Sequence, residues 1–146
     1  PIPSRGLGDV YKRQSFNNSE LTKRTSDIIE LAPLGSSLPL APETQWNLRL
    51  RYDKTFNTVP MYFQLSTTSA SESYSSLVLA RRYKQEAYNI LNFSIGVDFE
   101  DWAIELFARN LDDERAELYY NEMDETPRMH TIRPQNIGLR FKYTFR

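Results

Sequence analysis

Five segments of this chain alternate between apolar and polar residues at every second position. In the first of them, Leu48, Leu50 and Tyr52 are separated by Arg49 and Arg51. Because successive side chains of a β-strand point to opposite faces, such a segment predicts a strand with one apolar face and one polar face. The segments that show this pattern are residues 46–53, 59–68, 91–99, 102–109 and 137–145.

The connections between these five segments are alternately short and long. Residues 54–58 and 100–101 form short polar breaks, whereas 69–87 and 112–134 are long polar stretches, and part of 69–87 could form a short helix. A further polar stretch, 15–44, precedes the first segment and could hold the tail of another strand. This pattern predicts an all-β, antiparallel up-and-down meander with its turns at one end and its loops at the other.

Aromatic residues gather at the short-turn ends of the predicted strands. They are Tyr52, Phe56, Phe99, Trp102, Tyr143 and Phe145. Barrels that span a membrane combine short turns on one side, long loops on the other and aromatic girdles at the interfaces. A soluble antiparallel β-sandwich also produces alternation and stays open as an alternative, although its aromatic residues would spread through a core.

The first fourteen residues have the mark of a non-native segment. Ser4–Gln14 reads SRGLGDVYKRQ, which is one frame of a transposase adapter used in sequencing-library preparation. Eleven consecutive matches are very improbable by chance. We therefore predict that residues 1–14 are a scar that should be excluded from reasoning about the fold, and that native protein occupies residues 15–146.

Composition removes several classes of function. Cysteine is absent, which excludes disulfides, thiolate metal sites and a cysteine nucleophile. The formal net charge is −1, so a nucleic-acid partner held by bulk positive charge is not expected. There is no Gly-rich phosphate loop, and His130 is the only histidine, without the spacing of a catalytic triad. We expect no enzymatic activity and no cofactor.

Two groups of side chains are candidates for a functional role. The loop 112–134 mixes aromatic, methionine and acidic residues, and the substrate-binding candidates within it are Tyr119, Tyr120, Met123 and His130. Asp112, Asp113 and Glu114 could bind a cation, but the pattern favours solvated charges at a strand exit. The charged residues expected on the polar face of the strands, facing a wet lumen, are Arg49, Arg51, Glu105, Arg109, Arg140 and Lys142.

Several stretches of the chain resemble the C-terminal strands of TonB-dependent outer-membrane receptors. Residues 87–115 read as a tyrosine-led strand, an acidic turn, a Trp and an exit Asn110-Leu111-Asp112-Asp113-Glu114-Arg115, which is similar to that family's strand exit. Residues 38–53 resemble the family's loop into an Asn-Leu-x-x-x-Tyr strand. The resemblance covers about 38–146, and the order and spacing of the motifs carry it together.

The last segment resembles the terminal signal that the barrel-assembly machinery reads in such proteins. The matching residues are Asn136, Gly138, Phe141, Tyr143 and Phe145. An exposed edge strand pairs through main-chain bonds, while alternate side chains select the register. Arg146 departs from this pattern because it follows the expected terminal Phe.

The resemblance implies a partial transmembrane β-barrel of about five of 22 strands in the outer membrane of a Gram-negative bacterium. It implies uptake of a scarce large solute, such as a siderophore–iron complex, a cobalamin or an oligosaccharide. The implied partners are outer-membrane lipid, the assembly machinery and a TonB complex that acts through a plug domain missing from this chain. A passive porin-like channel and the soluble β-sandwich binding module remain alternatives.

Overall fold

The computed structural model describes residues 9–22, 33–123 and 126–145. Its main sheet has six antiparallel strands, β1 Asp9–Phe16, β2 Thr44–Phe56, β3 Val59–Ala70, β6 Tyr88–Asp98, β7 Trp102–Arg109 and β10 Asn136–Tyr143. Two small hairpins complete the fold: β4 Ser73–Tyr74 with β5 Lys84–Gln85, and β8 Glu117–Met123 with β9 Thr126–Thr131. Among the described residues, no helix is long and apolar enough to cross a membrane.

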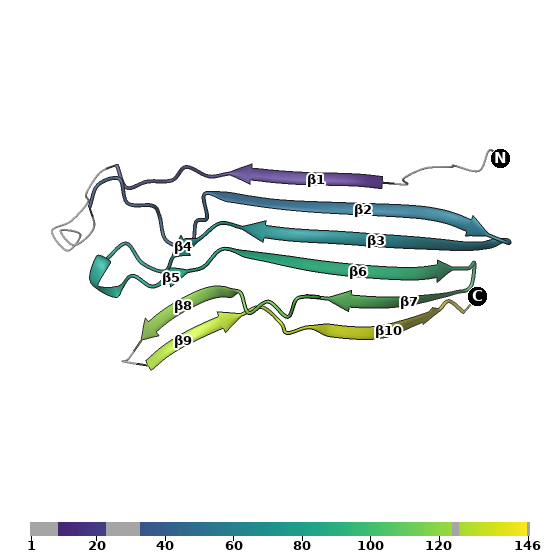
Figure 1. Ribbon diagram of the computed structural model, residues 1–146. Helices are drawn as coiled ribbons and strands as arrows, with labels where there is room; N and C mark the ends of the chain where they lie inside the picture. Colours follow the sequence, from purple (N-terminus) through teal and green to yellow (C-terminus); the bar gives the residue numbers. More distant parts are fainter. Residues whose placement is uncertain (1–8, 23–32, 124–125, 146) are drawn as a thin grey trace.

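The main sheet is the predicted antiparallel meander. Its spatial order, β1-β2-β3-β6-β7-β10, follows the order along the chain, and Figure 1 shows the long connections together at one end of the strands. At the other end, Asn57 and Thr58 turn the chain between β2 and β3 with φ values of 44° and 74°. Two positive φ values are the mark of a hairpin turn whose twist matches that of the strands.

The strand register aligns the apolar positions of all five predicted strands on one face of the sheet. Leu50 pairs with Leu65, and Leu65 with Phe93. Ile95 pairs with Leu106, and Leu106 with Leu139. Directly paired residues of an antiparallel ladder point to the same side, so the polar residues between them share the opposite side. We call these two sides the apolar face and the polar face.

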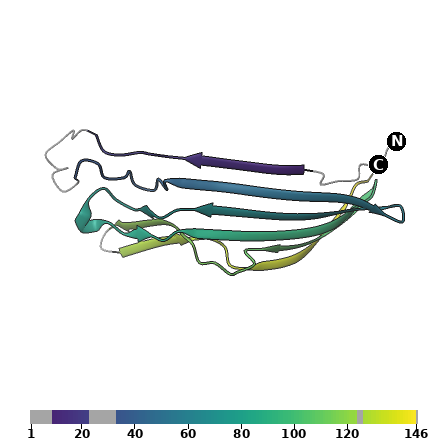
Figure 2. The same ribbon diagram turned by 45° about the horizontal axis from the view of Figure 1, so that its top comes forward.

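The few buried residues of this sheet lie on its polar face, and no residue of its apolar face is buried among the described strands. Within the described strands of the main sheet, the buried residues are Ala70, Ile90, Ser94 and Gly96, and the register places all four on the polar face. On β6, Ser94 is 6% exposed whereas its neighbour Phe93, on the apolar face, is 37% exposed. Figures 1 and 2 show a single layer of strands, which leaves the apolar face open.

The long connections contain more regular structure than the sequence pattern predicts. The prediction of a plain loop over 112–134 is wrong, because β8 and β9 form a hairpin there. The short helix considered in 69–87 is only a 3-10 turn, Leu79–Arg81, between β4 and β5. The last strand ends at Tyr143, so Phe145 lies beyond the ladder. The strands β4 and β5 have two residues each, and β8 mixes apolar and polar residues without a period of two, so alternation gives no signal for these hairpins.

The edge strand β1 does not follow the sidedness of the other strands. The register places Lys12 opposite Leu48 and Gln14 opposite Trp46, so two polar residues fall on the apolar face. Main-chain pairing tolerates such a sequence because its hydrogen bonds involve no side chains. The non-native origin of residues 1–14, of which residues 1–8 lie outside the described residues, stays a prediction.

Candidate functional site

The polar face carries the six charged residues predicted to share one side. The register brings Arg49, Arg51, Glu105, Arg109, Arg140 and Lys142 to that face. Three of them are in ion pairs on this face: Arg51 lies 3.0 Å from Asp53, and Arg140 lies 2.6 Å from Glu105. Arg49, Arg109 and Lys142 form no ion pair within the described residues. The lumen-facing role of these residues stays a prediction.

Arginine side chains on this face also lie over aromatic rings. The Arg51 guanidinium is 4.0 Å from the centre of the Tyr62 ring. Phe107 lies between two guanidinium groups, that of Arg109 at 5.0 Å and that of Arg140 at 5.4 Å. Such contacts add attraction between the positive charge and the ring face.

Each of these rings lies over a glycine on the neighbouring strand. Tyr62 pairs with Gly96, and Phe107 pairs with Gly138. A Cβ atom added to Gly138 would lie 2.6 Å from Phe107 Cζ, and one added to Gly96 would lie 2.5 Å from the Tyr62 ring. An aromatic side chain that covers a glycine in the next strand stabilises the sheet at that point. Gly138, predicted as part of an assembly signal, therefore has a steric reason to be glycine.

The substitution Gly138→Ala is expected to destabilise the sheet by about 1–3 kcal/mol, because the new methyl group overlaps the Phe107 ring. The unfolding free energy of the folded chain measures this cost. In a Phe107→Ala background the space is free, so the same substitution should cost almost nothing. An equal cost in both backgrounds would show that the ring is not the obstacle.

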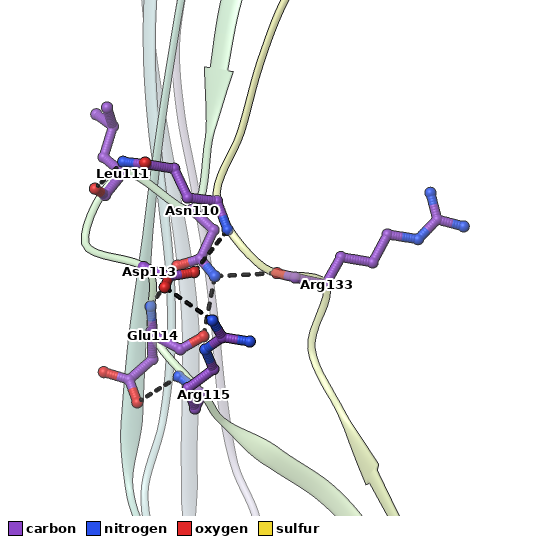
Figure 3. A network of polar contacts seen from close by, with 7 residues as sticks. Asn110, Leu111, Asp113, Glu114, Arg115 and Arg133 are labelled. Atoms are coloured by element: carbon purple, nitrogen blue, oxygen red, sulfur yellow. Dashed lines mark hydrogen bonds and ion pairs between the residues drawn. The ribbon is translucent and has the colours of Figure 1, made fainter.

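A buried asparagine organises the exit from β7. Asn110 is 3% exposed and has a φ of 52°, a left-handed conformation that asparagine tolerates better than most residues. Its side-chain amide donates to the backbone oxygens of Glu114 and Arg133, at 2.9 and 3.0 Å, and its carbonyl accepts from the Glu114 N–H at 2.9 Å (Figure 3). Asn110 thus holds together the two ends of the 111–135 connection.

Asp113 closes the same connection from the other side. Its carboxylate accepts from the Gln135 N–H at 2.8 Å and from Arg115 at 2.9 Å. The side chain of Gln135 in turn donates to the Leu111 carbonyl at 2.7 Å. We call Asn110, Asp113 and Gln135 the loop staple. The strand-exit motif is therefore a structural device, and its hydrogen bonds explain the Asp113 carboxylate without a cation.

The loop staple should depend on pH only in acid. The Gln135 N–H, with Arg115 beside it, lowers the pKa of Asp113 below its ordinary value of 3.8. A lowered pKa in the folded state means that the stabilisation is complete above the ordinary value and is lost as pH falls through the folded pKa. A carbon-13 NMR titration of this carboxyl should give a pKa below 3.8. Gln135→Pro, which removes the N–H, should raise it, whereas Gln135→Ala should not.

The predicted substrate-binding residues all lie on the β8–β9 hairpin, but not on one surface of it. Tyr119 pairs with His130, their rings 5.8 Å apart edge to face, while Tyr120 is on the opposite side of the hairpin and stacks on Tyr83 at 4.3 Å. Met123 ends β8, and its side chain lies outside the described residues. The structure brings Tyr119 and His130 together and separates Tyr120 from them.

Contacts that the sequence pattern did not indicate join the two long connections. The Tyr83 hydroxyl donates to the Glu117 carboxylate at 2.8 Å, which raises the pKa of that tyrosine. The buried Gln85 donates to the Glu117 backbone oxygen at 3.3 Å. Gln85 and Ala116 are among the most buried residues of the chain. Polar groups of side chains and main chain make these hydrogen bonds, so hydrophobic periodicity gives no signal for them.

The terminal strand β10 is a sheet edge with an exposed apolar side. Its described side chains Ile137, Leu139, Phe141 and Tyr143 are between 49% and 70% exposed, and Phe145 beyond the strand is 88% exposed. Asn136 pairs with Arg109 at the start of the strand. The predicted assembly residues therefore form an accessible edge, although their recognition by assembly machinery stays a prediction.

Comparison of the chain with protein-family models, with curated proteins and with solved structures gave no match in any of the three. Within the described part of the chain, no group of three or more histidine, cysteine, aspartate and glutamate side chains is placed to hold a metal ion.

Proposed function

We propose that this chain is part of the wall of a transmembrane β-barrel in a bacterial outer membrane, with its apolar face against lipid and its polar face toward a wet interior. One observation carries the proposal: the buried residues of the main sheet all lie on the polar face, whereas large apolar side chains of the apolar face, among them Leu65, Phe93 and Leu106, are exposed. A lipid bilayer solvates apolar side chains without cost, and a barrel wall has this sidedness.

The ends of the sheet agree with this proposal. At the short-turn end, Phe99 stacks on Trp102 at 4.1 Å, and Tyr143 contacts Phe145 at 4.8 Å. Amphipathic rings collect at the boundary between lipid and headgroups. At the other end, the hairpins β4–β5 and β8–β9 carry the charged and polar residues of the long connections, as expected for loops in water.

Within this class we propose a TonB-dependent receptor that takes up a scarce large solute. Support comes from the motif order in residues 38–146 and from the terminal pattern on β10. Energy would come from an inner-membrane complex through a plug domain, and the five strands here would supply part of a wall of about 22. The chain alone would not transport.

Single cysteines test the membrane assignment, because the chain has no cysteine of its own. Asn121→Cys places a thiol on the β8–β9 hairpin, and Glu100→Cys places one in the β6–β7 turn. In intact Gram-negative cells that express the gene product, a membrane-impermeant maleimide should label the first and not the second until the cells are permeabilised. Recovery of the protein in a soluble fraction, or equal labelling at both sites, would contradict the proposal.

Conductance separates the receptor from a passive channel. The gene product that contains this chain, purified and inserted into a planar lipid bilayer, should show no steady current if a plug fills its interior. A persistently open pore would replace the receptor assignment by a porin-like channel and would leave the wall assignment intact.

A further inference from the structure

A hollow of about 600 Å³ lies on the polar face, beneath the base of the β8–β9 hairpin. Its lining includes Ile90 and Asn92 of β6, Leu118 of β8 and Ile132, which directly follows β9. Ligand sites in proteins commonly measure 300–1,000 Å³ and combine an apolar lining with a few placed polar groups. The size and lining of this hollow are those of a small-molecule site.

The charges that line the hollow are of one sign. Arg109 and Arg133 belong to its lining, which contains no aspartate or glutamate. Neither arginine forms an ion pair with the described residues, and the nearby Asp113 is already paired with Arg115. Arg109 is exposed and lies beside the Phe107 ring, itself part of the lining. The chain as a whole has 18 basic and 19 acidic residues, so a lining with cations only is a local feature.

The carboxylates of the polar face lie nearer the short-turn end of the strands. Asp53 and Glu105 are there and neutralise Arg51 and Arg140. Unpaired cations beside aromatic and amide side chains attract an anion that also has an apolar body. We infer that this hollow binds a small organic anion, through Arg109 to its charge and through Phe107, Ile90 and Leu118 to its apolar part. The inference does not depend on what surrounds the apolar face.

The test uses three probes of one shape and different charge: naphthalene-2-carboxylate, naphthalene-2-carboxamide and 2-naphthylmethylammonium. Equilibrium dialysis against the full chain in detergent micelles measures their binding. The carboxylate should bind about tenfold more tightly than the amide, as a charge-assisted hydrogen bond provides, and the ammonium should bind most weakly. Tighter binding of the amide or the ammonium would overturn the inference.

Matched variants test whether the preference for the carboxylate probe arises in the hollow. Arg109→Gln should weaken binding of the carboxylate about tenfold, and Arg109→Lys should keep most of the preference. Arg49 is the control, because it is an unpaired arginine on the same face that is not part of the lining. Arg49→Gln should change the affinity less than twofold. Equal losses at the two positions would mean that the anion responds only to the general charge of the face.

The anion-binding inference and the membrane assignment can fail independently of each other. A chain recovered as a soluble protein that still prefers the carboxylate through Arg109 would overturn the barrel wall and keep the anion site. An outer-membrane protein with no such preference would overturn the anion site and keep the barrel wall.

Discussion

Replacing Asn110 by alanine should lower the unfolding free energy by about 3 kcal/mol, a loss that combines three side-chain hydrogen bonds with a left-handed backbone conformation. The amide is almost completely buried, so water cannot easily replace the partners that it loses. The oxygens of Glu114 and Arg133 would both lose their donor. Denaturant unfolding of the lipid-refolded chain measures the loss.

Two further substitutions identify the cause of that loss. Asn110→Asp keeps the acceptor and removes both donated bonds, so it should fall between the native chain and the alanine variant. Asn121→Ala is the matched control, because Asn121 lies in the same connection and makes no hydrogen bond through its side chain among the described residues. Its effect should stay within about 0.5 kcal/mol. A loss for Asn110→Ala as small as that of the control would refute the structural role of the loop staple.

An arginine on the apolar face should cost far more than an arginine on the polar face. Leu65 lies near the middle of β3, on the apolar face, between Leu50 and Phe93. If this face meets lipid, Leu65→Arg should destabilise the protein by about 2–4 kcal/mol. Unfolding from lipid vesicles is the appropriate measurement, because micelles deform around a charge more easily than a bilayer does.

The neighbouring residue provides the matched control for this experiment. Gln64 precedes Leu65 on β3 and pairs with Arg51 and Ser94 on the polar face. Gln64→Arg should cost at most about 1 kcal/mol, from repulsion between like charges across the strands. Since Leu65 is 41% exposed, a face open to water would tolerate both arginines about equally, and that result would exclude the lipid-facing role.

The order and sidedness of the main strands could be predicted because alternation repeats over many residues. The positions of Leu50, Phe93 and Leu106 within their segments were enough to place them on one face, and the register confirms this. The relation between faces and burial is different, since period-two alternation is the same whichever face is sheltered. Only the structure reveals that Ser94 is buried while Phe93 is open.

The contacts between the long connections could not be predicted from the sequence for another reason. They use few apolar side chains: Gln85 donates to a backbone oxygen of Glu117, and Asn110 holds backbone groups far along the chain. Such bonds depend on local backbone geometry that no hydrophobic pattern encodes. The pattern also gives no sign that aromatic rings cover Gly96 and Gly138. A glycine is neither apolar nor polar, so it does not change the alternation at its position.

The central claim is that the sheet has lipid on its apolar face and water on its polar face. The most direct test of this claim is to attach a fluorescent label at successive positions along β7. Each residue from Ala103 to Ala108 is replaced in turn by cysteine and labelled with bimane in lipid vesicles. Brominated lipid should quench the label at 104, 106 and 108, and aqueous iodide should quench it at 103, 105 and 107. Quenching without this two-residue period, or iodide access at 104, 106 and 108, would contradict a wall with lipid on one side and water on the other.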